Sequence, residues 1–181
     1  MKVSNQVLIE DLTKRTKDHI TKAEGYQQLE LKKLNLKKTP EKWSLLECIE
    51  HLNRYGDFYI PEINRRIQVG KGVTEATFKS GWLGNYFAES MLPKEQLNKM
   101  KTFKSMNPAG SQLGKETLDK FIKQQEELLV LLEKAKTIDL VKTKTAISIS
   151  KLIKLRLGDT FRVVIYHNYR HIVQADACLL S

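Results

Sequence analysis

Cysteine is scarce in this chain of 181 residues, which contains only Cys48 and Cys178. The two lie too far apart for the paired spacing of a zinc knuckle, and they make no disulfide framework. We therefore expect two buried or half-buried thiols in a reducing compartment.

Long apolar runs are missing as well. No stretch approaches the roughly 20 consecutive apolar residues that a membrane-spanning helix needs. The apolar stretch near the N-terminus is interrupted by Glu10 and Asp11, unlike a secretory signal peptide. With 41% hydrophobic and 29% charged residues, the chain can still bury a core, which excludes a disordered protein. We expect one cytoplasmic domain over residues 1–181 that does not contact a membrane.

Blocks of like charge are also absent, although 31 basic against 21 acidic residues give a net charge of +10. Such an excess can indicate binding to nucleic acid or to an acidic surface. Here the lysines are scattered in ones and twos, and no basic helix is interleaved with aromatic residues. We therefore expect a solvated basic surface and no specific nucleic-acid partner, and keep nucleic-acid binding as a third hypothesis.

Proline and glycine number only 4 and 9, and neither occurs before Gly25 or between Lys115 and Leu157. Such stretches favour helices over a fold with many turns. Apolar residues at helical spacing predict an all-α protein, a four-helix bundle with one long crossover. The predicted helices span roughly residues 4–31, 44–69, 115–136 and 160–180.

The crossover between the second and third helices, residues 73–113, is predicted to be irregular because glycine and proline are spread through it. A short helix is expected near residues 93–99. A loop of this length is usually functional or packs over something, and its role stays open. Residues 145–150 alternate apolar and polar side chains, which predicts a short extended segment.

Helix starts carry clear signals. Ser44 and Glu47 form a capping box, in which the serine hydroxyl accepts from the N3 amide and the glutamate accepts from the serine amide. Ser4 and Asp159 are the predicted N-caps of the first and last helices.

The sequence has four histidines: His19, His51, His167 and His171. His167 and His171 are four residues apart on a predicted helix, so they project from one face, in the geometry that lets two imidazoles bind one divalent ion. His51 supplies a third nitrogen if its helix is a neighbour in the bundle. The spacing alone fits equally well two amphipathic side chains at the edge of the core. His19 belongs to no motif and is expected at the surface or the core edge.

Two segments resemble the DinB-like superfamily. Residues 43–52 read WSLLECIEHL and match its W-S-x-x-E-x-x-x-H-L segment, and residues 167–174 read HNYRHIVQ and match its H-x-x-R-H-x-x-Q segment. Residues 82–84 and 99–108 look like the middle of the same family, so the resemblance covers roughly residues 5–178.

The resemblance implies a metal site. Members of the family are four-helix bundles that bind a divalent metal through three histidines, which by position are His51, His167 and His171 here. Three neutral imidazoles suit Zn²⁺ or Ni²⁺ and leave open coordination positions, as in catalytic sites. A water molecule or a thiol at an open position ionises more readily and becomes a better nucleophile.

The resemblance also implies a class of function. Characterised relatives include thiol S-transferases that use low-molecular-weight thiols, a maleylpyruvate isomerase and metal-dependent hydrolases. A metal-dependent enzyme of the thiol S-transferase or hydrolase type, acting on a small molecule, is the first hypothesis, and a low-molecular-weight thiol is a candidate partner. The alternative is a non-catalytic metal- or ligand-binding bundle in a stress response. A homodimer is one assembly that we consider.

Two further residues are weaker catalytic candidates. Glu47 lies one turn before His51 and either orients its imidazole, acts as a base, or serves only the capping box. Gln174 lies one turn beyond His171 and either bonds a ligand histidine or water, or is an ordinary polar residue of the bundle. Cys48 either approaches the site or packs in the core.

Asn168 stands where many relatives have a glutamate directly after the first histidine of the last helix. It is one step, about 100°, around the helix from His167 and should point away from a metal. Trp43 is expected to cap the core at the start of its helix, and Tyr55 or Tyr59 to line a pocket.

Overall fold

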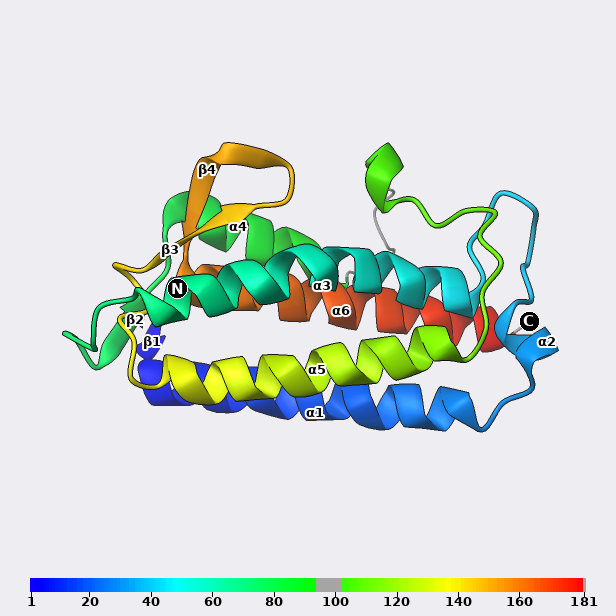
Figure 1. Ribbon diagram of the computed structural model, residues 1–181, viewed down its shortest axis with the longest axis horizontal. Helices are drawn as coiled ribbons and strands as arrows, with labels where there is room; N and C mark the ends of the chain where they lie inside the picture. The colour runs from blue at the N-terminus through cyan, green and yellow to red at the C-terminus, as the bar shows by residue number, and fades with distance from the viewer. Residues whose placement is uncertain (94–101, 181) are drawn as a thin grey trace.

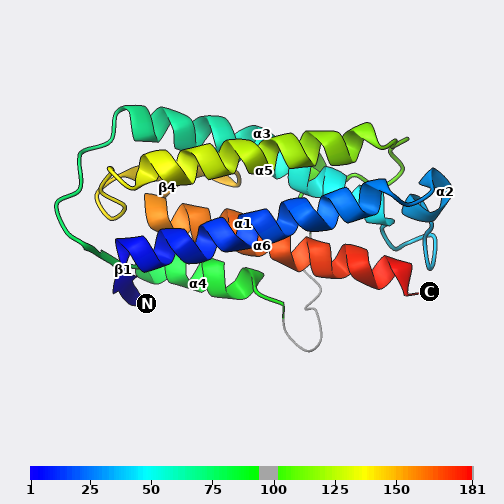
Figure 2. The same cartoon turned by 90° about the horizontal axis from the view of Figure 1, so that it is seen from below.

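Four long helices lie side by side along the molecule, as Figures 1 and 2 show for the computed structural model. The structure describes residues 1–93 and 102–180. Helices α1 and α6 run in one direction and α3 and α5 in the other, and each long helix packs on one parallel and one antiparallel neighbour, in the order α1–α5–α3–α6 around the bundle. The all-α bundle prediction is therefore confirmed. The long helices are α1 (Asn5–Gln27), α3 (Leu45–Gln68), α5 (Glu116–Ala135) and α6 (Leu157–Leu179).

The predicted caps of the first two long helices are confirmed. The Ser44 hydroxyl accepts from the Glu47 amide at 3.2 Å, and the Glu47 carboxylate accepts from the Ser44 amide at 2.9 Å. The Ser4 hydroxyl accepts from the Val7 amide at 3.1 Å. After Gln27 the chain turns, so the first helix ends before the predicted limit near residue 31, and a short helix α2 (Leu31–Leu34) follows.

The prediction that residues 73–113 are irregular is wrong for part of the crossover. Strand β2 (Thr77–Lys79), helix α4 (Trp82–Met91) and a 3₁₀ turn (Lys104–Met106) lie within it. Helix α4 packs on α6, and Gly84 permits the contact because a Cβ there would lie 2.4 Å from the Asp159 carboxyl carbon. The short helix predicted near residues 93–99 falls outside the described residues, apart from Pro93.

Asp159 is not the N-cap of the last helix. The helix begins at Leu157, after Arg156, so Asp159 lies in its first turn. Its buried carboxylate instead accepts from the Ser80 hydroxyl and from the Gly81 amide, and pairs with Arg162. These bonds fasten the start of α6 to the start of α4.

Two small antiparallel sheets close one end of the bundle. Strand β1 (Lys2–Ser4) pairs with β2, with Val3 opposite Phe78. Strands β3 (Lys144–Ile147) and β4 (Ser150–Arg156) form a hairpin, with Thr145 opposite Leu155. The predicted extended segment thus corresponds to β3 and the turn, whereas its longer partner strand was not predicted.

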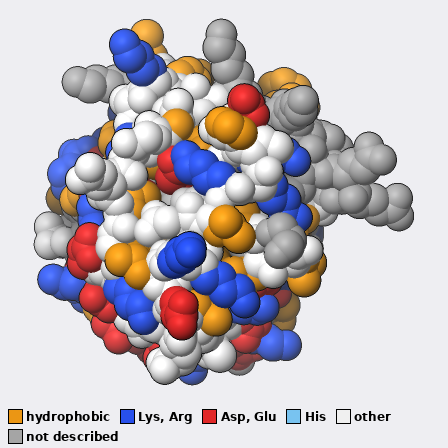
Figure 3. All heavy atoms as spheres, turned by 90° about the vertical axis from the view of Figure 1, so that its right-hand side faces the viewer, with side chains coloured by type: hydrophobic (Ala, Val, Ile, Leu, Met, Phe, Trp, Pro, Cys, Tyr) orange, Lys and Arg blue, Asp and Glu red, His pale blue; other side chains and the backbone are white. Residues whose placement is uncertain are grey.

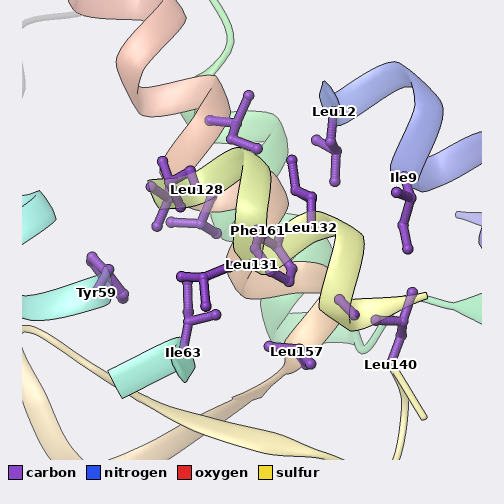
Figure 4. Close-up of a cluster of buried hydrophobic side chains, with 14 of the residues drawn as sticks. Ile9, Leu12, Tyr59, Ile63, Leu128, Leu131, Leu132, Leu140, Leu157 and Phe161 are labelled. Carbon is purple, nitrogen blue, oxygen red and sulfur yellow. The ribbon is translucent and has the colours of Figure 1, made fainter. Parts of the chain in front are cut away.

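The core lies between the four long helices. Figure 4 shows side chains from α1, α3, α5 and α6 converging: Ile9, Leu12, Ile63, Leu128, Leu131, Leu132 and Phe161. His19 joins the buried side chains at 3% exposure and stacks on Tyr169, so the expectation of a surface or edge position is wrong.

Lysines and arginines on the end of the bundle shown in Figure 3 are interspersed with acidic and apolar side chains. Within the described ranges, no helix has the length and apolar character required to cross a membrane.

Candidate metal centre

Three histidines from two neighbouring helices meet between α3 and α6. His51 comes from α3, and His167 and His171 come from successive turns of α6. One ring nitrogen of each lies within 4.8 Å of the others. The Nε2 atoms of His51 and His167 are 3.3 Å apart, and the ring centroids of the three pairs lie 4.5–5.1 Å apart. The structure thus brings together all three residues that the sequence singled out.

Outward-facing partners orient two of the three rings. The Nδ1 atom of His51 lies 2.7 Å from the Met106 carbonyl oxygen, which can only accept, so Nδ1 carries the proton. The Nδ1 atom of His171 lies 2.9 Å from the side-chain oxygen of Gln174 and donates to it in the same way. In both rings the lone pair is therefore left on Nε2. Holding the outer nitrogen in this manner is what fixes the tautomer of a metal-binding histidine.

Burial keeps the three imidazoles neutral. His51 and His171 are 3% and 9% exposed, and desolvation lowers the pKa of His51 to about 4 and that of His171 to about 3. Desolvation, and then the two neighbouring histidines, holds the pKa of His167 well below its usual range. At neutral pH all three rings can act as donors to a cation, because the neutral imidazole is the form that ligates.

The donor set fits a divalent ion. A tetrahedral ion with nitrogen ligands at about 2.0–2.1 Å holds those nitrogens roughly 3.3–3.4 Å apart. The 3.3 Å between the Nε2 atoms of His51 and His167 agrees with that spacing, and the third nitrogen, of His171, lies within 4.8 Å of the other two. Three imidazoles without a carboxylate do not suit Mg²⁺ or Ca²⁺, which prefer oxygen ligands.

The histidines open onto a cavity of about 850 Å³. Two aromatic rings flank them: the Trp43 centroid lies 4.8 Å from that of His51, and the Tyr55 centroid lies 4.6 Å from that of His167. Both Tyr55 and Tyr59 line this cavity, which confirms the expectation that one or the other lines a pocket. Part of the wall comes from α4 and the β3–β4 hairpin, which contribute Phe87, Met91, Ile147 and Leu155. Lys38, Lys42 and Arg170 add positive charge to the lining.

Glu47 is held in structural contacts. Besides the capping box, its carboxylate accepts from the Lys37 ammonium at 2.6 Å and from the Gly110 amide at 3.0 Å. It thereby fastens the segments before α3 and before α5 to the start of α3. A catalytic role for Glu47 stays a prediction, as it does for Gln174.

Neither Asn168 nor Cys48 is among the residues that line the cavity. The Asn168 amide donates to Gln125 of α5 at 2.9 Å, in a buried contact. Cys48 is buried in the core. Cys178, in contrast, lines the cavity.

Sequence reasoning did not identify the Met106 carbonyl, the outer partner of His51. A backbone carbonyl has no residue signature, and it reaches the site only because the 3₁₀ turn at Lys104–Met106 passes beside α3. The apolar walls supplied by α4 and the hairpin were missed with those elements.

One of three comparisons with known proteins found a match, and it covers the histidine cluster. Among curated proteins and among solved structures, nothing matches the chain. The family model of the DinB superfamily matches residues 12–175, a span that contains all three histidines of the cluster. Because that match covers most of its length, and because the fold is a four-helix bundle, the chain belongs to the DinB superfamily.

Proposed function

We propose that the protein is a divalent-metal-dependent enzyme of the thiol S-transferase or hydrolase type, in which His51, His167 and His171 hold the ion. One observation carries the proposal: three imidazole nitrogens from two neighbouring helices lie within 4.8 Å of one another beside a large cavity. A purely structural metal site has four protein ligands and is closed, whereas three ligands beside a cavity are typical of catalytic sites.

An ion held there would supply Lewis acidity, which lowers the pKa of a water molecule or a thiol brought to it. The protein itself sets the charge and the tautomer of the three ligand histidines. The three histidines stay neutral because they are buried, and Met106 and Gln174 keep the protons of His51 and His171 on the outer nitrogens.

The lining of the cavity favours a small-molecule substrate, because it offers both apolar and positively charged surface. Around the histidines the tyrosines and the residues of α4 and the hairpin offer apolar and aromatic contact. Lys38, Lys42 and Arg170 offer positive charge to an anionic group, such as the carboxylate of a low-molecular-weight thiol. A volume of about 850 Å³ is within the usual range for ligand pockets and accommodates two small reactants together.

Activity assays test the proposal directly. Protein stripped of metal and then reloaded with Zn²⁺ or Ni²⁺ is assayed with a panel of electrophiles plus small thiols, and with simple amides. We expect turnover only in the loaded protein, and its loss in His167→Ala and His171→Ala, while Asn168→Ala serves as the control that keeps both metal and activity.

Two outcomes contradict the proposal. Equal turnover by stripped and loaded protein shows that the reaction does not use the ion. Full metal content without turnover on any substrate of the panel favours the alternative, a non-catalytic metal- or ligand-binding bundle.

A further inference from the structure

The fold brings the two cysteines of the chain together. Cys48 lies in the second turn of α3 and Cys178 in the last turn of α6, and a side-chain hydrogen bond links the two thiols. Both are reduced, and they border one core cluster, Cys48 within it and Cys178 packed against it. This contact joins the two helices that carry the histidines, at the end of the bundle where α3 begins.

The two thiols differ in access. Cys48 is 0% exposed and lies among core residues such as Leu45 and Ile49. Cys178 is half-buried and forms part of the cavity lining, so a small molecule in the cavity meets its sulfur first. Cys178 is thus placed to react, and Cys48 to react only with Cys178.

The surroundings also favour the thiolate of Cys178. The hydrogen bond from Cys48 lowers the pKa of Cys178 to about 7, and the charges of Lys38 and Lys42 act in the same direction, against burial and Glu47. The same bond raises the pKa of Cys48, which stays a thiol and a donor. As a thiol, Cys178 can instead donate to the carbonyl of Gln174 or Trp43, each at 3.4 Å.

We propose that Cys48 and Cys178 form a thiol–disulfide exchange site that reduces a small-molecule disulfide entering through the cavity. The Cys178 thiolate attacks one sulfur of the disulfide, forming a mixed disulfide and releasing one small thiolate. Cys48 then loses its proton to that thiolate and attacks the Cys178 sulfur, which forms the Cys48–Cys178 bond and releases the second small molecule as a thiolate, which takes a proton from water. The small disulfide gains two electrons, and the pair of cysteines loses two.

The exchange site is separate from the histidine cluster but adjoins it. The Cys178 sulfur lies 3.4 Å from the Trp43 carbonyl oxygen, and the Trp43 ring lies against His51 and His171. The new bond would link the start of α3 to the end of α6 beside that ring. Neither sulfur needs a metal for the exchange, so the proposal stands whether or not the histidines bind one.

The test uses bis(2-hydroxyethyl) disulfide as the probe on the reduced, folded wild-type protein. After an acid quench, intact mass and peptide mapping report the state of each thiol. We expect both free thiols to be lost together, a mass lower by two hydrogen atoms, and a cross-linked pair of peptides containing Cys48 and Cys178. Wild-type protein that keeps both thiols, or that accumulates the mixed disulfide without a cross-link, overturns the proposal.

Two variants separate the steps, with circular dichroism as the check on folding. In Cys48→Ala the mixed disulfide on Cys178 should persist because no second thiol displaces it. In Cys178→Ala the remaining Cys48 should stay unmodified until urea unfolds the chain. Modification of Cys48 in folded Cys178→Ala at the wild-type rate contradicts the assigned order of attack. The wild-type mapping decides the existence of the bond even where a variant does not fold.

Discussion

His19 makes the folded protein sensitive to acid, although it is outside the histidine cluster. It is 3% exposed on α1, and its Nδ1 atom has no hydrogen-bond partner among the residues that the structure describes. Desolvation, and then the charge of Arg15, lowers the pKa of His19 to about 3. The same residue in the unfolded chain titrates near 6.5.

The sign and size of the effect follow from proton linkage. Below about pH 6.5 the unfolded chain binds a proton on His19 that the folded protein does not bind until about pH 3, so acid favours unfolding in this window. Above it both states are neutral and the contribution is flat. Between pH 7.5 and pH 5 the free energy of unfolding should fall by about 2 kcal/mol through this one residue.

The perturbation is His19→Phe, which keeps a ring against Tyr169 and removes the titration. Urea unfolding of both proteins, without metal, gives the free energy of unfolding at pH 7.5 and pH 5. The other three histidines are common to both proteins, so their effect cancels in the difference. We expect the variant to gain about 2 kcal/mol relative to wild type on going to pH 5. A difference that is the same at both pH values refutes the reasoning.

Three other predictions concern packing, ligand orientation and capping. Gly84→Ala should destabilise the protein by about 1–3 kcal/mol in thermal unfolding, because its Cβ would lie 2.4 Å from the buried carboxyl carbon of Asp159. Gly25→Ala, where nothing lies within 4 Å, is the matched control and should stabilise it by roughly 0.5–1 kcal/mol, and equal effects would contradict the packing argument. Gln174→Leu removes the acceptor for His171 and should weaken Zn²⁺ binding by about 10–100-fold in a competition titration. Unchanged affinity would show that this hydrogen bond does not support metal binding. Glu47→Ala should cost about 1–3 kcal/mol of stability and leave the metal content of the folded protein unchanged, whereas loss of metal at full folding would assign Glu47 to the site.

The helices of the bundle could be predicted because apolar spacing and capping residues are local signals. Helix α4 could not, because Gly81 and Gly84 look like breakers in the sequence. In the fold Gly81 is the N-cap of α4, and Gly84 lets it approach Asp159. The role of Asp159 was misassigned for the same reason, since its partners Ser80 and Gly81 lie far away in the sequence.

In the candidate site, too, the residues marked by local sequence signals could be predicted, and the contacts that depend on the fold could not. The i, i+4 pair of His167 and His171 is visible in the sequence, and the match to a family motif adds His51. Their outer partners are of two kinds: Gln174 follows from helical spacing, whereas the Met106 carbonyl depends on the path of a loop. The contact of Cys48 with Cys178 also depends on the bundle, because nothing in their separation along the chain indicates that they meet.

Metal content per chain is the decisive measurement for the site formed by His51, His167 and His171. Purified wild-type protein and the variants His51→Ala, His167→Ala and His171→Ala are dialysed against Zn²⁺, freed of excess, checked for folding and submitted to elemental analysis. We predict about one ion per wild-type chain and near-complete loss in each variant, because each substitution removes one of the three nitrogen donors. Full occupancy in folded His167→Ala and His171→Ala, or wild-type protein that retains no ion, would contradict it.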